Sequence, residues 1–254
     1  MNVTVLGASG SMSAPGEPAS GYLVQGPEGA LVMDLGPGSF GELQRHIDPC
    51  SVDVALSHLH ADHCLDLPGM IVWRRFHPKD GGGAKANLFG PSDTAERIGR
   101  ASAETGDSID DISDTFNVHT LTARQSFQAG GMTVTPFPMV HPIVTFGFRV
   151  ESADYCMAYT GDTAWTDELV EMAQGADLLL AEATWCGSAE GPVAGMHISG
   201  FEAGRAAREA GVRELVLTHI PPYNDKEAAL AAARSEFDGP VSLAYCGRVI
   251  EVGN

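Results

Sequence analysis

The chain has 254 residues, with 33 acidic against 15 basic side chains, and its net charge of −18 disfavours nucleic acid as a partner because phosphate contacts need a basic face. No apolar run approaches the ~20 residues of a membrane span, and the first residues lack the basic start and apolar run of a signal peptide. Five cysteines without a CxxC pair indicate a reducing compartment, so we expect a cytoplasmic protein with no membrane contact.

Short runs rich in apolar and β-branched residues predict strands along most of the chain. Their ranges are 2–6, 21–25, 30–35, 53–57, 132–136, 145–151, 155–160, 177–182, 214–218 and 241–245. Two segments, 178–180 and 215–217, are apolar at every position, which is typical of strands buried on both faces.

Helical patterns lie between these runs. Ser199 begins a capping box and Gly211 ends the helix that follows it, while Asn224 with Glu227 repeats the capping signal before an alanine-rich segment. Two more ranges predict helices: 67–76 and 93–103. The first part of the chain reads mostly as hairpins, and in the last part strands alternate with helices. This order indicates a layered α/β protein with helices covering two packed sheets. The glycine-rich range 79–85 predicts a mobile surface loop within it.

The segment His58-Leu59-His60-Ala61-Asp62-His63 carries the strongest chemical signal, directly after an apolar strand. On a strand-like segment His58 and His60 point the same way, since side chains there repeat every two residues. Asp62 and His63 then turn toward a helix start. Such a set can hold two metal ions a few ångströms apart. The alternative is a polar structural loop that binds no metal.

Two ions need further ligands, and three polar residues stand where other apolar runs end: His141, Asp162 and His219. Each one alone could be an ordinary polar residue at a strand end. Together with the histidine-rich segment they supply the donors that a dinuclear site requires. The segment 7–11 lacks the lysine of a phosphate-binding P-loop, so a turn beside the metal site is the expectation there.

With these motifs the sequence resembles the metallo-β-lactamase superfamily, in the phosphodiesterase branch that contains ribonuclease Z, and more closely the actinobacterial cyclic-nucleotide phosphodiesterases of that fold. The matching landmarks span the chain: 6–11, 34–36, 58–63, 90–92, His141, 161–163, 182–184, His197 and 217–219. The resemblance implies an α/β protein with a four-layer αββα sandwich, in which two mixed β-sheets are flanked by helices. It also implies that residues 1–254 form a single hydrolase domain.

The resemblance assigns ligands to two divalent metal ions. His58, His60 and His141 would hold the first ion, Asp62, His63 and His219 the second, and Asp162 would bridge both. Zn²⁺ is the first expectation, with Mn²⁺ or Fe as alternatives, because imidazole and carboxylate groups suit all three metals. The ions would leave the pocket about +1 and so attract a singly charged phosphodiester.

The resemblance makes Asp62, Glu182 and His197 the catalytic set. By similarity to ribonuclease Z, Glu182 hydrogen-bonds His197, which protonates the leaving oxygen; the alternative is a structural loop histidine. The residues after His197 depart from the His-Ser-Thr usual in ribonuclease Z, which counts against that enzyme. Asp34 corresponds to an acid that orients a ligand histidine, unless it is an ordinary turn aspartate.

The implied activity is hydrolysis of small cyclic nucleotides, 3′,5′-cyclic AMP to 5′-AMP, by attack of a hydroxide held between the ions. The alternative is ribonuclease Z-type cleavage at the 3′ end of precursor tRNA, which shares the chemistry but conflicts with the acidic charge. Thiolester or β-lactam hydrolysis and a non-catalytic role rank lower. The expected partner is therefore a small nucleotide, with a homodimer as a further possibility.

Two weaker features of the sequence each have two interpretations. The segment Trp73-Arg74-Arg75 either reaches a substrate phosphate or base, or lies on an exposed helix face. Tyr223, after a Pro-Pro pair, either lines the pocket or is a loop aromatic without a role.

Overall fold

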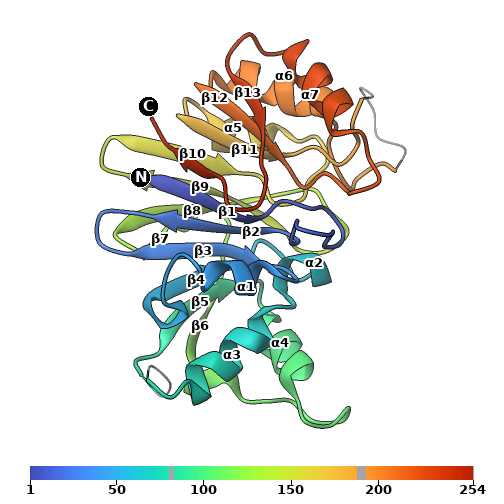
Figure 1. Cartoon of the computed structure of the whole chain (residues 1–254). Coiled ribbons are helices and arrows are strands. Elements are labelled where there is room, and N and C mark those ends of the chain that lie inside the picture. The colour runs from blue at the N-terminus through green and yellow to red at the C-terminus, as the bar shows by residue number, and fades with distance from the viewer. Residues whose placement is uncertain (80–82, 188–192, 254) are drawn as a thin grey trace.

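Two β-sheets lie face to face and helices cover their outer sides, as Figure 1 shows for the computed structural model. The structure describes residues 1–79, 83–187 and 193–253. The predicted α/β class and the arrangement of two mixed sheets flanked by helices are confirmed. The loop predicted over 79–85 falls partly outside the described residues.

The first sheet has seven strands in the order β14-β1-β2-β3-β4-β5-β6. Its strands are β14 (Val249–Glu251), β1 (Asn2–Gly7), β2 (Gly21–Gln25), β3 (Ala30–Leu35), β4 (Val52–Ala55), β5 (Ala86–Gly90) and β6 (Phe116–Thr120). Strands β14 to β3 are antiparallel, and β3 to β6 are parallel.

The second sheet repeats this plan in the order β13-β12-β11-β10-β9-β8-β7. Its strands are β7 (Phe127–Ala129), β8 (Met132–Pro138), β9 (Phe146–Ser152), β10 (Tyr155–Tyr159), β11 (Leu178–Glu182), β12 (Glu214–Thr218) and β13 (Val241–Leu243). Strands β7 to β10 are antiparallel and β10 to β13 are parallel. Antiparallel hairpins and parallel strands thus occur in both sheets. The expectation that hairpins lie early in the chain and strand–helix alternation late was therefore wrong.

Seven α-helices and two short 3₁₀ helices connect the described strands. They are α1 (Ser39–Leu43), α2 (Ala61–Cys64), α3 (Leu67–Phe76), α4 (Thr94–Ser102), α5 (Asp167–Ala173), α6 (Gly200–Ala210), α7 (Lys226–Arg234), η1 (Pro49–Ser51) and η2 (Ile112–Asp114). Figure 1 places α1 and α3 beside the first sheet and α5, α6 and α7 beside the second. Within the described residues, no helix has the length and apolar character needed to span a membrane.

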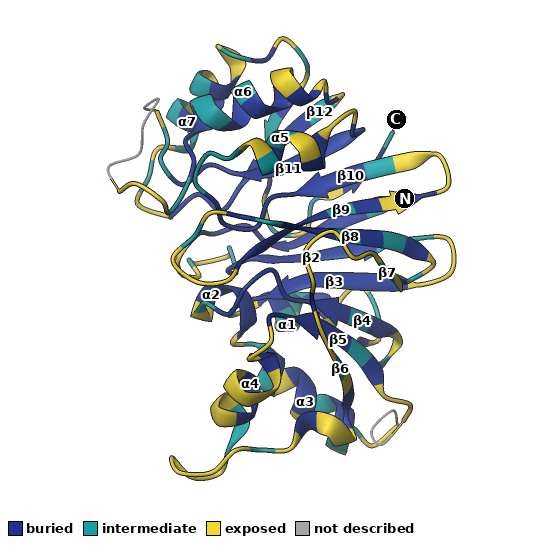
Figure 2. Cartoon of the chain, turned by 180° about the vertical axis from the view of Figure 1, so that it is seen from behind, coloured by how far each residue is buried: buried dark blue, intermediate teal, exposed yellow. Residues whose placement is uncertain are grey.

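The main apolar core lies between the two sheets. Met33 from the first sheet and Phe148, Leu180 and Val216 from the second belong to one fully buried cluster. Figure 2 shows this burial as dark blue strands in the middle of the molecule, with exposed residues mainly on the helices and loops. The continuous apolar runs of β11 and β12 are buried at every position, because helices cover the face that does not meet the other sheet.

Helix α6 begins and ends as the sequence predicts. Ser199 and Glu202 form a capping box, and Gly211 ends the helix in the left-handed conformation. The predicted cap at Asn224 was wrong, since Asp225 accepts the backbone hydrogens that begin α7. Asn224 instead donates from its side-chain nitrogen to the carbonyl of Thr184 at 2.7 Å.

Neither predicted role of the arginine pair on α3 holds. Arg74 is 5% exposed and donates to the backbone carbonyls of Pro49 and Ala84. Arg75 pairs with Asp110 and Asp114. Both arginines therefore fasten α3 to neighbouring loops, and their groups are used in structural contacts.

Candidate metal centre and active site

Polar residues from both sheets converge where strands end. The segment 58–63 follows β4, Asp162 follows β10, and His219 follows β12. The structure brings all seven predicted ligands into two groups, in each of which the donor atoms lie within 4.8 Å of one another. One group is His58, His60, His141 and Asp162, and the other is Asp62, His63, Asp162 and His219.

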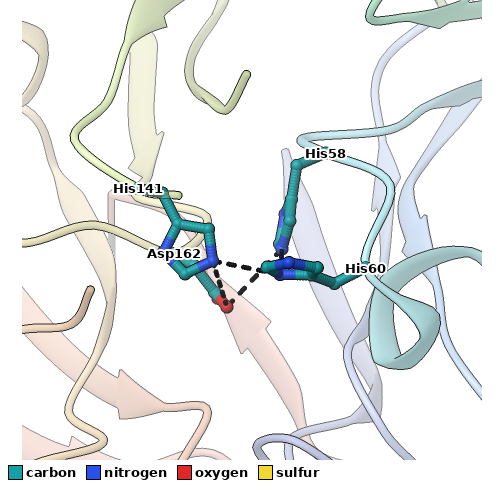
Figure 3. Close-up of side chains that lie close together, drawn as sticks. All are labelled: His58, His60, His141 and Asp162. Atoms are coloured by element: carbon teal, nitrogen blue, oxygen red, sulfur yellow. Dashed lines mark hydrogen bonds and ion pairs between the residues drawn. The ribbon is translucent and has the colours of Figure 1, made fainter. Parts of the chain in front are cut away.

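The first group is drawn in Figure 3, with its side chains pointing toward a common centre. The Nδ1 atom of His60 lies 3.1 Å from Nε2 of His58 and 3.0 Å from Nε2 of His141. Asp162 Oδ2 lies 3.6 Å and 3.8 Å from those two Nε2 atoms. Four donors at about 2.0–2.1 Å from one tetrahedral ion stand about 3.3 Å apart, so these spacings fit a single ion of the size of Zn²⁺.

The second group has the same spacing. The Nε2 atoms of His63 and His219 are 3.2 Å apart, and Asp62 Oδ2 lies 3.1 Å from that of His219. Asp162 Oδ1 is 3.2 Å and 3.4 Å from the same two nitrogens, and it is buried without a hydrogen-bond partner. One oxygen of Asp162 faces each group, which is the geometry of a carboxylate that bridges two ions.

Two of the histidines are oriented by groups that only accept hydrogen bonds. His63 Nδ1 lies 2.8 Å from Asp34 Oδ2, and His141 Nδ1 lies 2.8 Å from the carbonyl of Met196. Both Nδ1 atoms therefore carry a proton, and the Nε2 atoms of both rings face a metal group.

Two further histidines are oriented by hydroxyls whose protons are already used. His58 Nδ1 lies 3.0 Å from Ser57 Oγ, which donates its proton to Asp34. His219 Nδ1 lies 3.0 Å from Thr184 Oγ1, which donates to the carbonyl of His219. These hydroxyls accept from the imidazoles, so the four Nε2 atoms are the ones that face the two groups. Burial acts to lower the pKa of His63, but Asp162, Asp34 and Asp62 outweigh it and raise that pKa well above its usual range, so its Nε2 holds a proton that a metal ion would replace.

Burial favours the neutral form of three of the histidines, which is the form that binds a metal ion. Desolvation lowers the pKa of His58 well below its usual range and also lowers the pKa of His60 and His141. The positive form of each neighbouring imidazole adds to this effect. All three rings are therefore neutral near pH 7, as metal coordination demands.

The two carboxylates stay ionised despite their burial. Desolvation acts to raise the pKa of Asp162, but the surrounding histidines, His219 first, hold it well below its ordinary value. Desolvation also acts to raise the pKa of Asp62, and His63 together with His219 outweighs it. The paired charges match a site for divalent cations.

Comparison with known proteins identifies the family of this chain. The family described as the beta-lactamase superfamily domain matches residues 31–220. The chain belongs to the metallo-β-lactamase superfamily. It is similar to the Mycobacterium tuberculosis protein Rv1339, at 50% identity over 99% of this chain and 92% of that protein.

Two more relatives place this superfamily member among hydrolases. Bacillus subtilis YhfI, described as a probable metallo-hydrolase, is 30% identical over 99% of this chain and its whole length. Its crystal structure matches with a TM-score of 0.86, at 27% identity over 98% of this chain and 99% of that chain. A ribonuclease Z of Myxococcus xanthus is 26% identical over 99% of this chain and 98% of that enzyme. The chain is thus a metallo-hydrolase of this fold, with donor clusters suited to a dinuclear metal site.

Glu182 and His197 lie beside the metal groups of this metallo-hydrolase. The two Glu182 oxygens are 3.0 Å and 3.1 Å from His197 Nδ1, and Asp162 Oδ2 is 4.0 Å from the same nitrogen. Burial acts to lower the pKa of His197, but Glu182 and then Asp162 outweigh it and raise that pKa to about 9. The ring is therefore protonated at neutral pH, with Nδ1 bonded to Glu182.

The environment of Asp34 contains partners that sequence analysis missed. Its carboxylate accepts from the amide and hydroxyl of Ser57, from His63 and from the hydroxyl of Tyr159 at 2.7 Å. Tyr159 directly precedes the segment of Asp162, which is the one signal that could have identified it. Asp34 has a φ of 58°, a strained conformation for this residue type that its four hydrogen bonds over-determine.

Ser11 is a second contact that sequence analysis missed, although the turn beside the site was expected. Its amide donates to Asp62 Oδ2 at 2.9 Å, and its backbone has a positive φ of 64°. A Cβ on neighbouring Gly10 would stand 2.4 Å from the carbonyl of His219. The turn therefore packs directly against the second group.

Replacement of Asp34 should weaken metal binding. We expect Asp34→Ala to lower metal affinity about 10–100-fold, because His63 loses the partner that orients its ring. Competition with a chromogenic chelator measures this affinity. Tyr159→Phe is the matched control, since it removes one donor to Asp34 and leaves His63 bonded. Wild-type affinity in Asp34→Ala would contradict the assigned role.

A methyl group at Gly36 should displace Asp62. Its Cβ would stand 1.9 Å from the backbone oxygen of Asp62, whereas a Cβ at Gly41 meets nothing within 4 Å. We expect Gly36→Ala to lose bound metal, while Gly41→Ala keeps it and gains about 0.5–1 kcal/mol of stability within α1. Metal analysis and denaturant unfolding of both variants measure the difference, and equal metal content would refute the close approach.

Proposed function

We propose that this metallo-hydrolase is a dinuclear metal-dependent phosphodiesterase that converts 3′,5′-cyclic AMP to 5′-AMP, with Zn²⁺ as the resident metal. The observation that carries the proposal is the Glu182–His197 pair, whose His197 Nδ1 lies 4.0 Å from Asp162 Oδ2. A protonated imidazole beside two metal groups suits the cleavage of a bond to a poor leaving group such as an alkoxide. The same proposal takes residues 1–254 as one cytoplasmic hydrolase domain.

The residues divide the reaction between them. Two divalent ions held by the two groups would supply Lewis-acid activation and charge neutralisation at the phosphate. His58, His60 and His141 keep neutral lone pairs directed at one position, and Asp162 links it to the other. A water molecule supplies the oxygen that bonds to phosphorus as the P–O3′ bond breaks. His197 donates its Nε2 proton to the departing O3′, while Glu182 holds the ring and stabilises its charged form.

The distribution of basic groups supports a small substrate over a polyanion. The chain has twelve arginines and three lysines. Nine of the arginines pair with carboxylates, and Arg74, Arg97 and Arg234 donate to backbone carbonyls. A tRNA brings tens of phosphates that need several free cations, whereas a cyclic nucleotide brings a single charge.

Ribonuclease Z-type cleavage of precursor tRNA is the second candidate. The observation that favours it is the 26% identity with the Myxococcus xanthus ribonuclease Z across nearly the whole of both chains. The proposed acid pair and the metal groups serve this reaction equally well, since it also breaks a phosphodiester. The choice therefore depends on how the rest of the substrate is held.

A direct assay distinguishes the two candidates. The metal-loaded protein is incubated with 3′,5′-cyclic AMP, 2′,3′-cyclic nucleotides and precursor tRNA, beside an Asp162→Asn variant. We expect hydrolysis of cyclic AMP to 5′-AMP by the wild type alone. Cleavage of tRNA without cyclic AMP would reverse the order of the candidates, and no cleavage of any substrate would reject both.

A further inference from the structure

We propose that Tyr223 binds the flat base of the substrate by stacking and so determines specificity for nucleotides among phosphodiesters. The inference rests on the proposed function and adds the group that is recognised next to the phosphate. Three observations support the inference: the position of Tyr223 in the chain relative to His219, the contacts that hold its turn, and the apolar side chains exposed on the loops that carry the proposed ligands.

Tyr223 is tied to the metal groups from two directions. It follows His219 by four residues, so its Cα lies within about 15 Å of that ligand at 3.8 Å per residue. The next residue, Asn224, donates to the carbonyl of Thr184 at 2.7 Å, and the hydroxyl of Thr184 is 3.0 Å from His219. The turn therefore cannot move away from the site without breaking contacts to a residue that orients a proposed ligand.

The turn that carries this ring is rigid, yet the ring itself faces solvent. Pro221 and Pro222 restrict the backbone, and the amide of Asn224 donates to the carbonyl of Pro221 at 2.9 Å. Tyr223 is nevertheless 70% exposed. An aromatic ring on a restrained turn gives large contact area at low conformational cost, which is the property of aromatic residues that bind ligands.

Other loops that carry the proposed ligands also expose apolar side chains. These side chains, each within three residues of His63 or His141, are Leu65, Val140, Ile143 and Val144. Every arginine of the chain already has a partner, so these loops provide apolar surface without a free guanidinium. One phosphate-binding centre with an apolar surround matches a ligand that has one negative charge and one flat ring. A nucleobase is such a ring, and one base–aromatic stack contributes on the order of ten-fold in affinity.

The test compares a substrate that has a base with one that lacks it. Wild type, Tyr223→Ala and Tyr223→Phe are assayed on cyclic AMP and on the abasic 3′,5′-cyclic phosphate of the same sugar. We expect Tyr223→Ala to raise KM for cyclic AMP about 10-fold with kcat nearly unchanged, and to leave kcat/KM for the abasic compound as in wild type. Tyr223→Phe should behave as wild type, because a phenyl ring still stacks. Tyr155→Ala is the matched control, since that half-exposed ring begins β10 at the end opposite Asp162. An equal loss on both substrates would overturn the inference.

A binding measurement separates this inference from the proposed reaction. Calorimetry on metal-loaded wild type and Tyr223→Ala compares AMP with ribose 5-phosphate, which differ in the base. We expect wild type to prefer AMP and the variant to lose that preference, even when no cyclic nucleotide is hydrolysed. Equal affinity of the wild type for the two compounds would refute the role of Tyr223, whatever reaction the enzyme performs.

Discussion

Asp162→Asn is expected to lower kcat/KM at least about 10³-fold and to remove most of the bound metal. The amide that replaces the carboxylate has one neutral oxygen, and it cannot present a negative oxygen to both groups as Oδ1 and Oδ2 now do. Losing charge stabilisation of several kcal/mol corresponds to this factor, at 1.36 kcal/mol per tenfold in rate. Metal analysis by mass spectrometry and steady-state kinetics measure the two losses on one preparation.

A matched substitution separates the effect of Asp162 from a change of charge. Asp107→Asn alters the net charge by the same amount at an exposed position of the loop after α4. We expect it to retain the metal content and activity of the wild type. If Asp162→Asn also retained two ions per chain, the carboxylate would not bridge them, and the dinuclear arrangement would be wrong.

His197→Ala should lose activity according to the leaving group. On cyclic AMP, where an alkoxide must be protonated as it departs, we expect a loss of about 10²–10⁴-fold in kcat, the usual contribution of a general acid. On bis(p-nitrophenyl) phosphate the loss should be much smaller, because p-nitrophenolate leaves without a proton. The ratio of the two activities is the quantity that identifies an acid.

Glu182→Gln is an independent test of the role of the Glu182–His197 pair. The amide can still contact His197 Nδ1, but it no longer stabilises the charged imidazole that now holds its proton with a pKa of about 9. We expect the same preference for the nitrophenyl ester, with a smaller loss on cyclic AMP than in His197→Ala. If both variants lost equal activity on the two substrates, the pair would be structural. Metal content is measured in each variant, so that a loss of ions is distinguished from a loss of the proton donor.

The histidine-rich segment was predictable because its chemistry is contiguous. Four donors within six residues follow a strand, and their types restrict the chemistry to metal binding or a polar loop. The strand and helix patterns indicated two packed sheets covered by helices, and the resemblance added the four-layer αββα sandwich with two mixed sheets. The division of strands between two sheets was not readable from local patterns, since each sheet joins hairpins to parallel units that are distant along the chain.

Short or misleading local signals explain the remaining errors. Strands β5, β6, β7 and β14 were missed. Strand β5 is a mixed run of five residues, β6 alternates with exposed polar side chains, and β7 and β14 have three residues each. The cap of α7 moved by one residue, because the side chain of Asn224 is used by Thr184 instead. Arg74 was expected on an exposed helix face or at a substrate phosphate. It is buried instead, because the folded chain places two backbone carbonyls where they accept hydrogen bonds from its guanidinium group.

By itself the sequence determined which donor atoms are available and that they stand at the ends of strands. Only the tertiary structure decided how those atoms are used. It joins Tyr159 to Asp34 across 125 positions of the chain, sets the proton on Nδ1 of four histidines, and places one oxygen of Asp162 in each group. The reason is physical: residue type and spacing follow from local order, whereas hydrogen-bond partners and charge neighbours exist once distant strands have packed together.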